Sequence, residues 1–95
     1  MDKDKLLNIL ENFSNLEKKL NSLTSDNFKD FAHLSKEYSD LKPLVENVND
    51  YLRCEKEIQE AEELLASEDE EIRDEALKEK NLLSEKKNEL QDKIR

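Results

Sequence analysis

A continuous helical stripe of apolar side chains runs through the segment Leu34–Ser67 and constrains the fold of this chain more than any other feature. Its apolar residues are separated alternately by three and four positions, which places them on one face of an α-helix. Such a face forms a seam that another helix packs against. The stripe therefore predicts a long central helix with helical partners. Its members are Leu34, Tyr38, Leu41, Val45, Val48 and Leu52, followed from Tyr51 by Cys54, Ile58, Ala61 and Leu65.

The composition excludes most alternatives to a helical fold. The 95 residues include no glycine and a single proline, so tight turns and β-hairpins, which rely on these residues, are disfavoured. With 35% apolar and 43% charged residues, the chain can bury narrow stripes between helices but cannot fill a thick globular core. We predict one all-α domain over residues 1–95, an elongated three-helix arrangement with a long antiparallel coiled-coil hairpin.

Cap-forming residues divide the chain into three helices. The polar segment Asn21–Asn27 ends the first helix, and either Ser25 or Asp26 is expected to cap the second. Ser67 and Glu70 have the spacing of a capping box, which predicts the start of the third helix. Because both links are short, neighbouring helices are expected to fold back antiparallel. The predicted helices cover residues 2–21, 26–66 and 68–95.

The flanking segments carry apolar faces of their own. The first helix has an a/d pattern from Leu6 to Leu23, and the start of the second extends the stripe back to Phe28 and Phe31. The third helix has the weakest face, because charged residues interrupt it. Its apolar residues at helical spacing are Ile72, Ala76, Leu83, Leu90 and Ile94.

Pro43 predicts an irregularity within the second helix. In a helix interior, proline removes a hydrogen bond and clashes with the preceding turn, at a cost of about 3 kcal/mol. In the first turn of a new helix it costs little, and Asp40 occupies the position of an N-cap three residues earlier. We therefore expect a kink or a one-residue break near residues 41–43. The half before Pro43 should pack against the first helix, and the half beyond Tyr51 against the third.

The net charge of −9 argues against binding to nucleic acids or membranes. Phosphate backbones and anionic bilayer surfaces attract clustered lysine and arginine. No apolar run approaches the roughly 18 residues of a membrane span, and the first residues do not form a signal peptide. A single cysteine allows no internal disulfide and fits a reducing compartment. We expect a cytoplasmic protein without direct nucleic-acid or membrane contact.

No cluster of residues points to catalysis, and no metal or cofactor is predicted. His33 and Cys54 are the only histidine and cysteine, and about 30 Å of helix separates them, which excludes a Cys–His pair. Cys54 occupies the apolar stripe and is interpreted as a small buried residue, and His33 as a surface or half-buried one. A calcium loop of the EF-hand type needs a glycine, which the chain lacks.

Residues 60–75 hold almost all of the net negative charge. Nine acids and one arginine give this run a charge of −8, whereas the other 79 residues together carry −1. The predicted chain reversal lies inside the run, so the acids collect at the tip of the hairpin. They form either a solvated turn that gains from the dipole of the third helix, or a docking patch for a basic protein surface whose attraction weakens with salt. The candidate docking residues, called the acidic tip below, are Glu62, Glu63, Glu68, Asp69, Glu70, Glu71, Asp74 and Glu75.

The order of these features resembles that of a known family. The segment LSKEYSDLKPLVE (Leu34–Glu46), followed by EIQEAEELLASEDEEIRDEALKE (Glu57–Glu79), is similar to the N-terminal domain of bacterial class I peptide chain release factors, of the type that reads UAA and UAG. The resemblance covers essentially the whole chain but only about the first quarter of a complete family member. The end at Ile94–Arg95, which lacks a usual helix stop, agrees with the expectation of an N-terminal fragment.

The resemblance implies a non-catalytic docking domain of a translation termination factor. The family's Gly-Gly-Gln hydrolysis loop and Pro-Xaa-Thr codon-reading tripeptide are not in this sequence, because glycine is absent and Pro43 is followed by Leu44 and Val45. The implied partners are proteins of the ribosomal GTPase-associated region, the recycling GTPase and the methyltransferase that modifies the catalytic glutamine. The periodicity alone supports an alternative, an unrelated cytoplasmic coiled-coil scaffold or dimerisation module.

Overall fold

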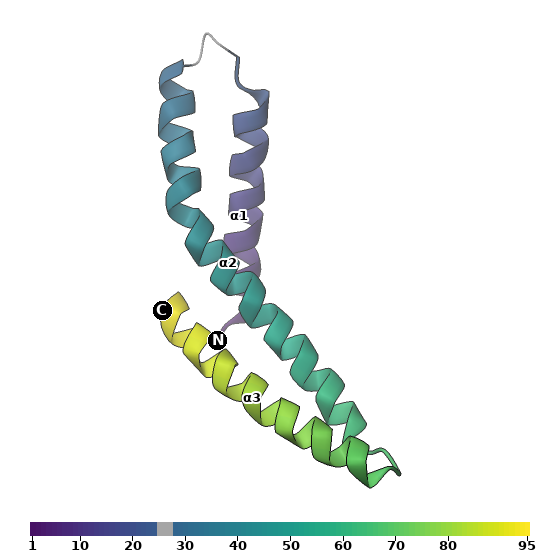
Figure 1. The fold of residues 1–95 in the computed structure, drawn as a ribbon. Helices are drawn as coiled ribbons and strands as arrows, with labels where there is room; N and C mark the ends of the chain where they lie inside the picture. The colour runs from purple at the N-terminus through teal and green to yellow at the C-terminus, as the bar shows by residue number, and fades with distance from the viewer. Residues whose placement is uncertain (25–27) are drawn as a thin grey trace. The chain divides into compact units, whose positions relative to one another are not determined.

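The computed structural model describes residues 1–24 and 28–95, which form three α-helices (Figure 1). Helix α1 spans Lys3–Ser22, α2 spans Phe28–Leu64 and α3 spans Glu70–Ile94. The described residues contain no β-strand, so the predicted all-α, three-helix fold is confirmed. The expected caps Ser25 and Asp26 lie outside the described residues. None of the described helices is both long and apolar enough to span a bilayer.

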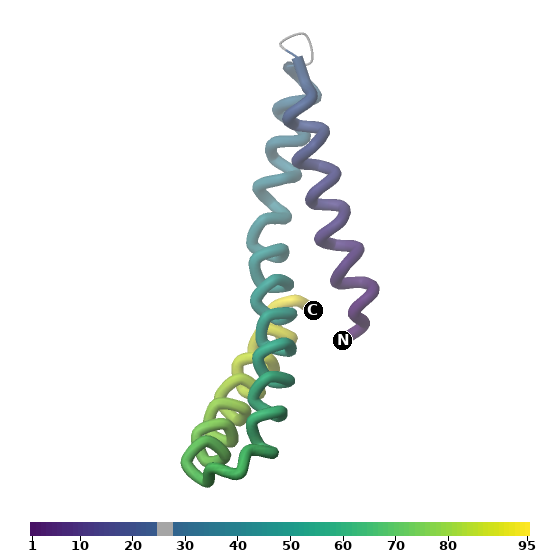
Figure 2. Tube along the Cα trace, turned by 90° about the vertical axis from the view of Figure 1, so that its right-hand side faces the viewer, coloured from purple at the N-terminus to yellow at the C-terminus, as the bar shows by residue number. Residues whose placement is uncertain are grey.

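The chain divides into two compact units, Met1–Val48 and Asn49–Arg95. The first unit contains α1 and the N-terminal part of α2, and the second contains the rest of α2 and all of α3. Within each unit two helical segments lie side by side, as Figures 1 and 2 both show. This division agrees with the expectation that the two halves of the central helix have different partners.

Packing in the first unit follows the predicted apolar face of α1. Leu6 and Leu16 of α1 are buried. The ring of Phe13 stacks on that of Tyr38 in α2, with 4.5 Å between the ring centroids. Stacked aromatic rings contribute beyond the apolar area that they bury. These contacts join α1 to the first part of α2 as an antiparallel pair.

Helix α2 continues through Pro43 as a single helix, so of the two predicted irregularities the break is wrong and the kink stays a prediction. Because Pro43 has no N–H, the carbonyl of Ser39, four residues earlier, loses its helical donor. Both residues are exposed, so water can satisfy that carbonyl. Val45 and Val48, beyond the proline, remain at helical spacing and are buried. Burial of this continuous apolar face offsets the cost of the proline. Asp40 consequently lies inside the helix and caps nothing.

Two ion pairs define the antiparallel register of α3 against the end of α2. The carboxylate of Glu62 lies 3.9 Å from the Lys80 ammonium, and that of Glu55 lies 3.5 Å from the Lys87 ammonium. Glu55 lies seven positions before Glu62 on α2, whereas Lys87 lies seven positions after Lys80 on α3. The order of the partners is therefore reversed between the two helices, as an antiparallel pair requires. The Lys87 ammonium also lies over the ring of Tyr51, 5.4 Å from its centroid. The predicted antiparallel hairpin is thus present in the second unit.

Small side chains form much of the core of the second unit. Tyr51, Cys54 and Ala61 of α2 are buried, as are Ala76 and Leu90 of α3. Alanine at core positions near the turn leaves little room between the two helices, because protein interiors are closely packed. Cys54 is a buried free thiol, as its place in the apolar stripe predicts.

Candidate docking surface at the tip of the hairpin

The chain reverses between α2 and α3 over residues 65–69 (Figure 2). Helix α2 ends in a tightened turn, in which the amides of Ala66 and Ser67 donate hydrogen bonds to the carbonyls of Glu63 and Leu64 at 3.3 and 3.1 Å. Bonds of this three-residue type satisfy carbonyls that the end of a helix leaves without partners. The reversal is therefore short and held by its own backbone.

Asp69, rather than Ser67, is the N-cap of α3. The Asp69 carboxylate accepts a hydrogen bond from the amide of Glu71 at 2.9 Å, and the helix starts at Glu70. The Ser67 hydroxyl accepts a hydrogen bond from the Asp69 amide at 3.2 Å and so shapes the turn before the cap. The predicted capping box of Ser67 and Glu70 is therefore wrong by two residues. A carboxylate caps as well as a hydroxyl does and also gains from the positive end of the helix dipole.

Arg73, the only cation among residues 60–75, takes part in holding the turn. Its guanidinium donates a hydrogen bond to the carbonyl of Ser67 at 2.7 Å, and the side chain is partly buried. This bond ties the first turn of α3 to the reversal that precedes it. The one positive group of the run is thus drawn toward the backbone, while the acids around it face the solvent.

All eight residues of the acidic tip are exposed, and the fold brings them to one end of the second unit. Two lie on the last turn of α2, two in the reversal and four on the first two turns of α3. One of them, Glu62, faces Lys80 at 3.9 Å, and an exposed pair of this kind contributes less than about 1 kcal/mol. The structure therefore places the predicted residues together.

A shallow groove, called the tip groove below, lies among these acids and has a volume of about 260 Å³. Leu64 of α2 and Ile72 of α3 line it and remain 48% and 41% exposed, while Ala76, a third lining residue, is buried. The remaining lining residues are acidic and exposed. They are Asp69, Glu71, Glu75 and Glu79.

The sequence patterns predict neither of the two exposed apolar residues of the tip groove. Leu64 is not a member of the predicted stripe, and Ile72 is predicted on the face of the third helix that packs inward. One signal could have identified Leu64, namely its neighbour Leu65. Adjacent residues on a helix point about 100° apart, so only one member of such a pair can face the partner helix squarely. Leu65 is half-buried and Leu64 is left exposed.

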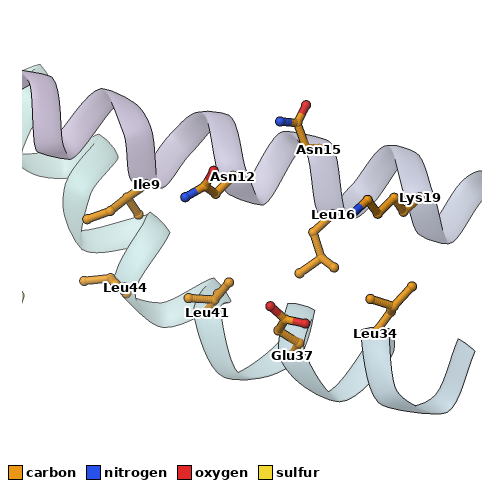
Figure 3. A pocket seen from close by; sticks show the side chains of 9 residues that line it. All are labelled: Ile9, Asn12, Asn15, Leu16, Lys19, Leu34, Glu37, Leu41 and Leu44. Carbon is orange, nitrogen blue, oxygen red and sulfur yellow. The ribbon is translucent and has the colours of Figure 1, made fainter. Parts of the chain in front are cut away.

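A second groove lies in the first unit between α1 and α2 (Figure 3), with a volume of about 390 Å³. Its lining mixes apolar side chains with two amides, one lysine and one glutamate, so neither charge dominates. Within the part of the chain that the structure describes, no group of three or more His, Cys, Asp or Glu side chains could hold a metal ion. The lining residues of this groove are Ile9, Asn12, Asn15, Leu16, Lys19, Leu34, Glu37, Leu41 and Leu44.

Comparison with known proteins resolves which helical family this is. The model of the PCRF domain matches residues 9–95, a range that includes nearly all of both units and the entire acidic tip. This chain belongs to the PCRF domain family. Together with the relatives described next, this match confirms the resemblance to the N-terminal domain of class I release factors. The family match also removes the alternative of an unrelated coiled-coil scaffold.

Several proteins named peptide chain release factor 1 are similar to this PCRF domain. The one from Endomicrobium trichonymphae is 36% identical over 96 residues, which cover 100% of this chain and 26% of the relative. The one from Caldicellulosiruptor saccharolyticus is 43% identical over 63 residues, covering 65% of this chain and 18% of the relative. The one from Wolbachia pipientis subsp. Culex pipiens is 35% identical over 63 residues, covering 66% and 17%.

This PCRF domain thus spans about a quarter of the length of the Endomicrobium trichonymphae relative, to which it aligns along its own full length. No solved structure matches the chain significantly.

Proposed function

We propose that this PCRF domain is the non-catalytic docking domain of a translation termination factor, which directs stop-codon-dependent release of the nascent peptide on the ribosome. The observation that carries the proposal is the PCRF match over residues 9–95, together with relatives named peptide chain release factor 1. The sequence has no glycine, so the Gly-Gly-Gln hydrolysis loop of the family belongs to another part of the factor. The factor acts in the cytoplasm, at UAA and UAG codons.

The acidic tip is the docking surface in this proposal. Its support is electrostatic: residues 60–75 carry a charge of −8, all eight acids of the tip are exposed and Arg73 is hydrogen-bonded to the turn. A concentrated charge accelerates encounter with an oppositely charged surface. Proteins of the ribosomal GTPase-associated region are the first candidates for that basic surface. The recycling GTPase and the glutamine methyltransferase are further candidates from the family.

Reversing three acids of the tip should slow ribosome binding. In a full-length release factor that carries this domain, the triple variant Glu68→Lys, Glu70→Lys and Glu71→Lys changes the charge of residues 60–75 from −8 to −2. Electrostatic steering raises association rates by tenfold or more, so we expect the rate at low salt to fall roughly tenfold. The deficit should shrink as salt is added, because salt screens exposed charges. Stopped-flow fluorescence with UAA-programmed ribosomes measures both effects.

A matched control variant separates the tip from the overall charge of the domain. The triple variant Glu11→Lys, Glu17→Lys and Glu46→Lys alters the net charge equally at exposed positions of the first unit. We expect it to retain most of the association rate. Equal slowing by both triple variants, or no slowing by the tip variant, would refute docking through the acidic tip.

A further inference from the structure

We infer that the tip groove receives an apolar side chain from a basic, amphipathic segment of the partner protein. This inference rests on the proposed function and adds to it the chemistry of the partner. It starts from two apolar residues, Leu64 and Ile72, that come from different helices and line the same groove while remaining 48% and 41% exposed.

The size of the tip groove fits a side chain better than a small molecule. Its volume of about 260 Å³ lies below the range of roughly 300–1,000 Å³ that is usual for small-molecule pockets. Ala76, which also lines the groove, is only 2% exposed, and its methyl side chain offers no polar atom. An apolar side chain in this groove would remove Leu64 and Ile72 from water, which is favourable in proportion to the area covered.

The negative charges that line the tip groove indicate that the segment carrying this side chain is basic. Four carboxylates line the groove, so lysine or arginine residues beside the apolar anchor would find acceptors there. A second copy of this domain would bring the same negative charge, and a nucleic acid would bring phosphates, and both would be repelled. A basic segment with an apolar residue in its middle is complementary in charge and in polarity. The lining carboxylates belong to Asp69, Glu71, Glu75 and Glu79.

The two parts of this surface should act on different rate constants. Exposed charges act over long distances and change the association rate, as the Glu68, Glu70 and Glu71 reversals test. The apolar contact forms only after encounter, so its removal changes the dissociation rate. This difference allows the groove to be tested separately from the charge.

The test replaces the apolar lining without changing charge. In the full-length factor, the double variant Leu64→Gln and Ile72→Gln keeps good helix formers in place and removes the apolar surface. We expect its dissociation from UAA-programmed ribosomes to be about five- to tenfold faster, with an unchanged association rate and salt dependence. The matched control is Leu77→Gln and Leu82→Gln, because these α3 leucines are at least as exposed but do not line the groove. The control should dissociate like the unmodified factor.

The outcomes distinguish the groove from the docking role. Unchanged dissociation of the groove variant, combined with slow association of the charge-reversed tip variant, would overturn the groove inference and leave the docking proposal standing. Equally fast dissociation of the groove and control variants would also overturn it, because the loss of exposed leucines outside the groove would then weaken binding just as much. If the groove variant and the charge-reversed variant both bind like the unmodified factor, the docking proposal fails together with the inference.

Discussion

Replacing Val48 with aspartate is expected to lower the free energy of unfolding by at least about 3 kcal/mol, because the new carboxylate would be buried without a partner. Val48 is 0% exposed, and the described residues contain no buried charged side chain that could pair with the new carboxylate. Small domains have a total stability of roughly 5–15 kcal/mol. The variant should therefore lose much of its helicity at ambient temperature, and adding Leu52→Asp should increase the loss. Urea unfolding followed by circular dichroism measures the change.

The neighbouring residue provides the control for this substitution. Asn49→Asp introduces the same charge one position further along α2, at an exposed site. Surface substitutions of this kind change stability by about 0.5 kcal/mol or less. If the Val48→Asp and Asn49→Asp variants unfold at the same urea concentration, the apolar face of α2 is not buried as described.

Ala76→Leu should destabilise the hairpin of the second unit by about 1–3 kcal/mol, which is the usual cost of adding methylene groups to a packed core. Ala76 is 2% exposed, and Ala61 of α2 is equally buried in the same unit, so little space remains for a larger side chain. Forcing the helices apart should also expose Cys54, the buried thiol of this core. We expect a lower midpoint in urea and faster modification of Cys54 by a thiol reagent.

The control for this substitution is Ala32→Leu, at an exposed position of α2. It adds the same side chain without entering a core, and leucine favours helices nearly as strongly as alanine does. Its stability and Cys54 reactivity should match those of the unmodified chain. If Ala76→Leu changes neither the urea midpoint nor the reactivity of Cys54, the two helices do not approach each other as closely as described.

The sequence predicts the helices and their pairing well because the apolar stripe is long and regular. Two of the expectations that fail rest on single residues. At Pro43 a local rule about proline competes with an apolar face that continues to Val45 and Val48, and the continuous face prevails. At the start of α3 Ser67 and Asp69 are both good caps, and the sequence does not determine which of them the chain uses.

The ends of the apolar faces are harder to predict than their middles. Periodicity shows which face of a helix is apolar but not how far the partner helix covers it. Phe28 and Phe31 continue the stripe of α2 in sequence, yet they remain 74% and 48% exposed at the start of the helix. Leu64, at the other end of α2, and Ile72, in the first turn of α3, are exposed too. The acids of the tip could be predicted from charge alone, but the tip groove depends on these partly covered ends.

The docking role is tested most directly by photo-crosslinking from the tip. The full-length factor would carry p-benzoylphenylalanine in place of Glu68, at the exposed reversal between α2 and α3, or in place of Glu17, on the exposed face of α1. After binding to UAA-programmed ribosomes, position 68 is expected to cross-link to a basic ribosomal protein more strongly than position 17 does. Cross-links from position 17 with none from position 68, or cross-links from position 68 to ribosomal RNA alone, would contradict docking of the acidic tip on a basic protein.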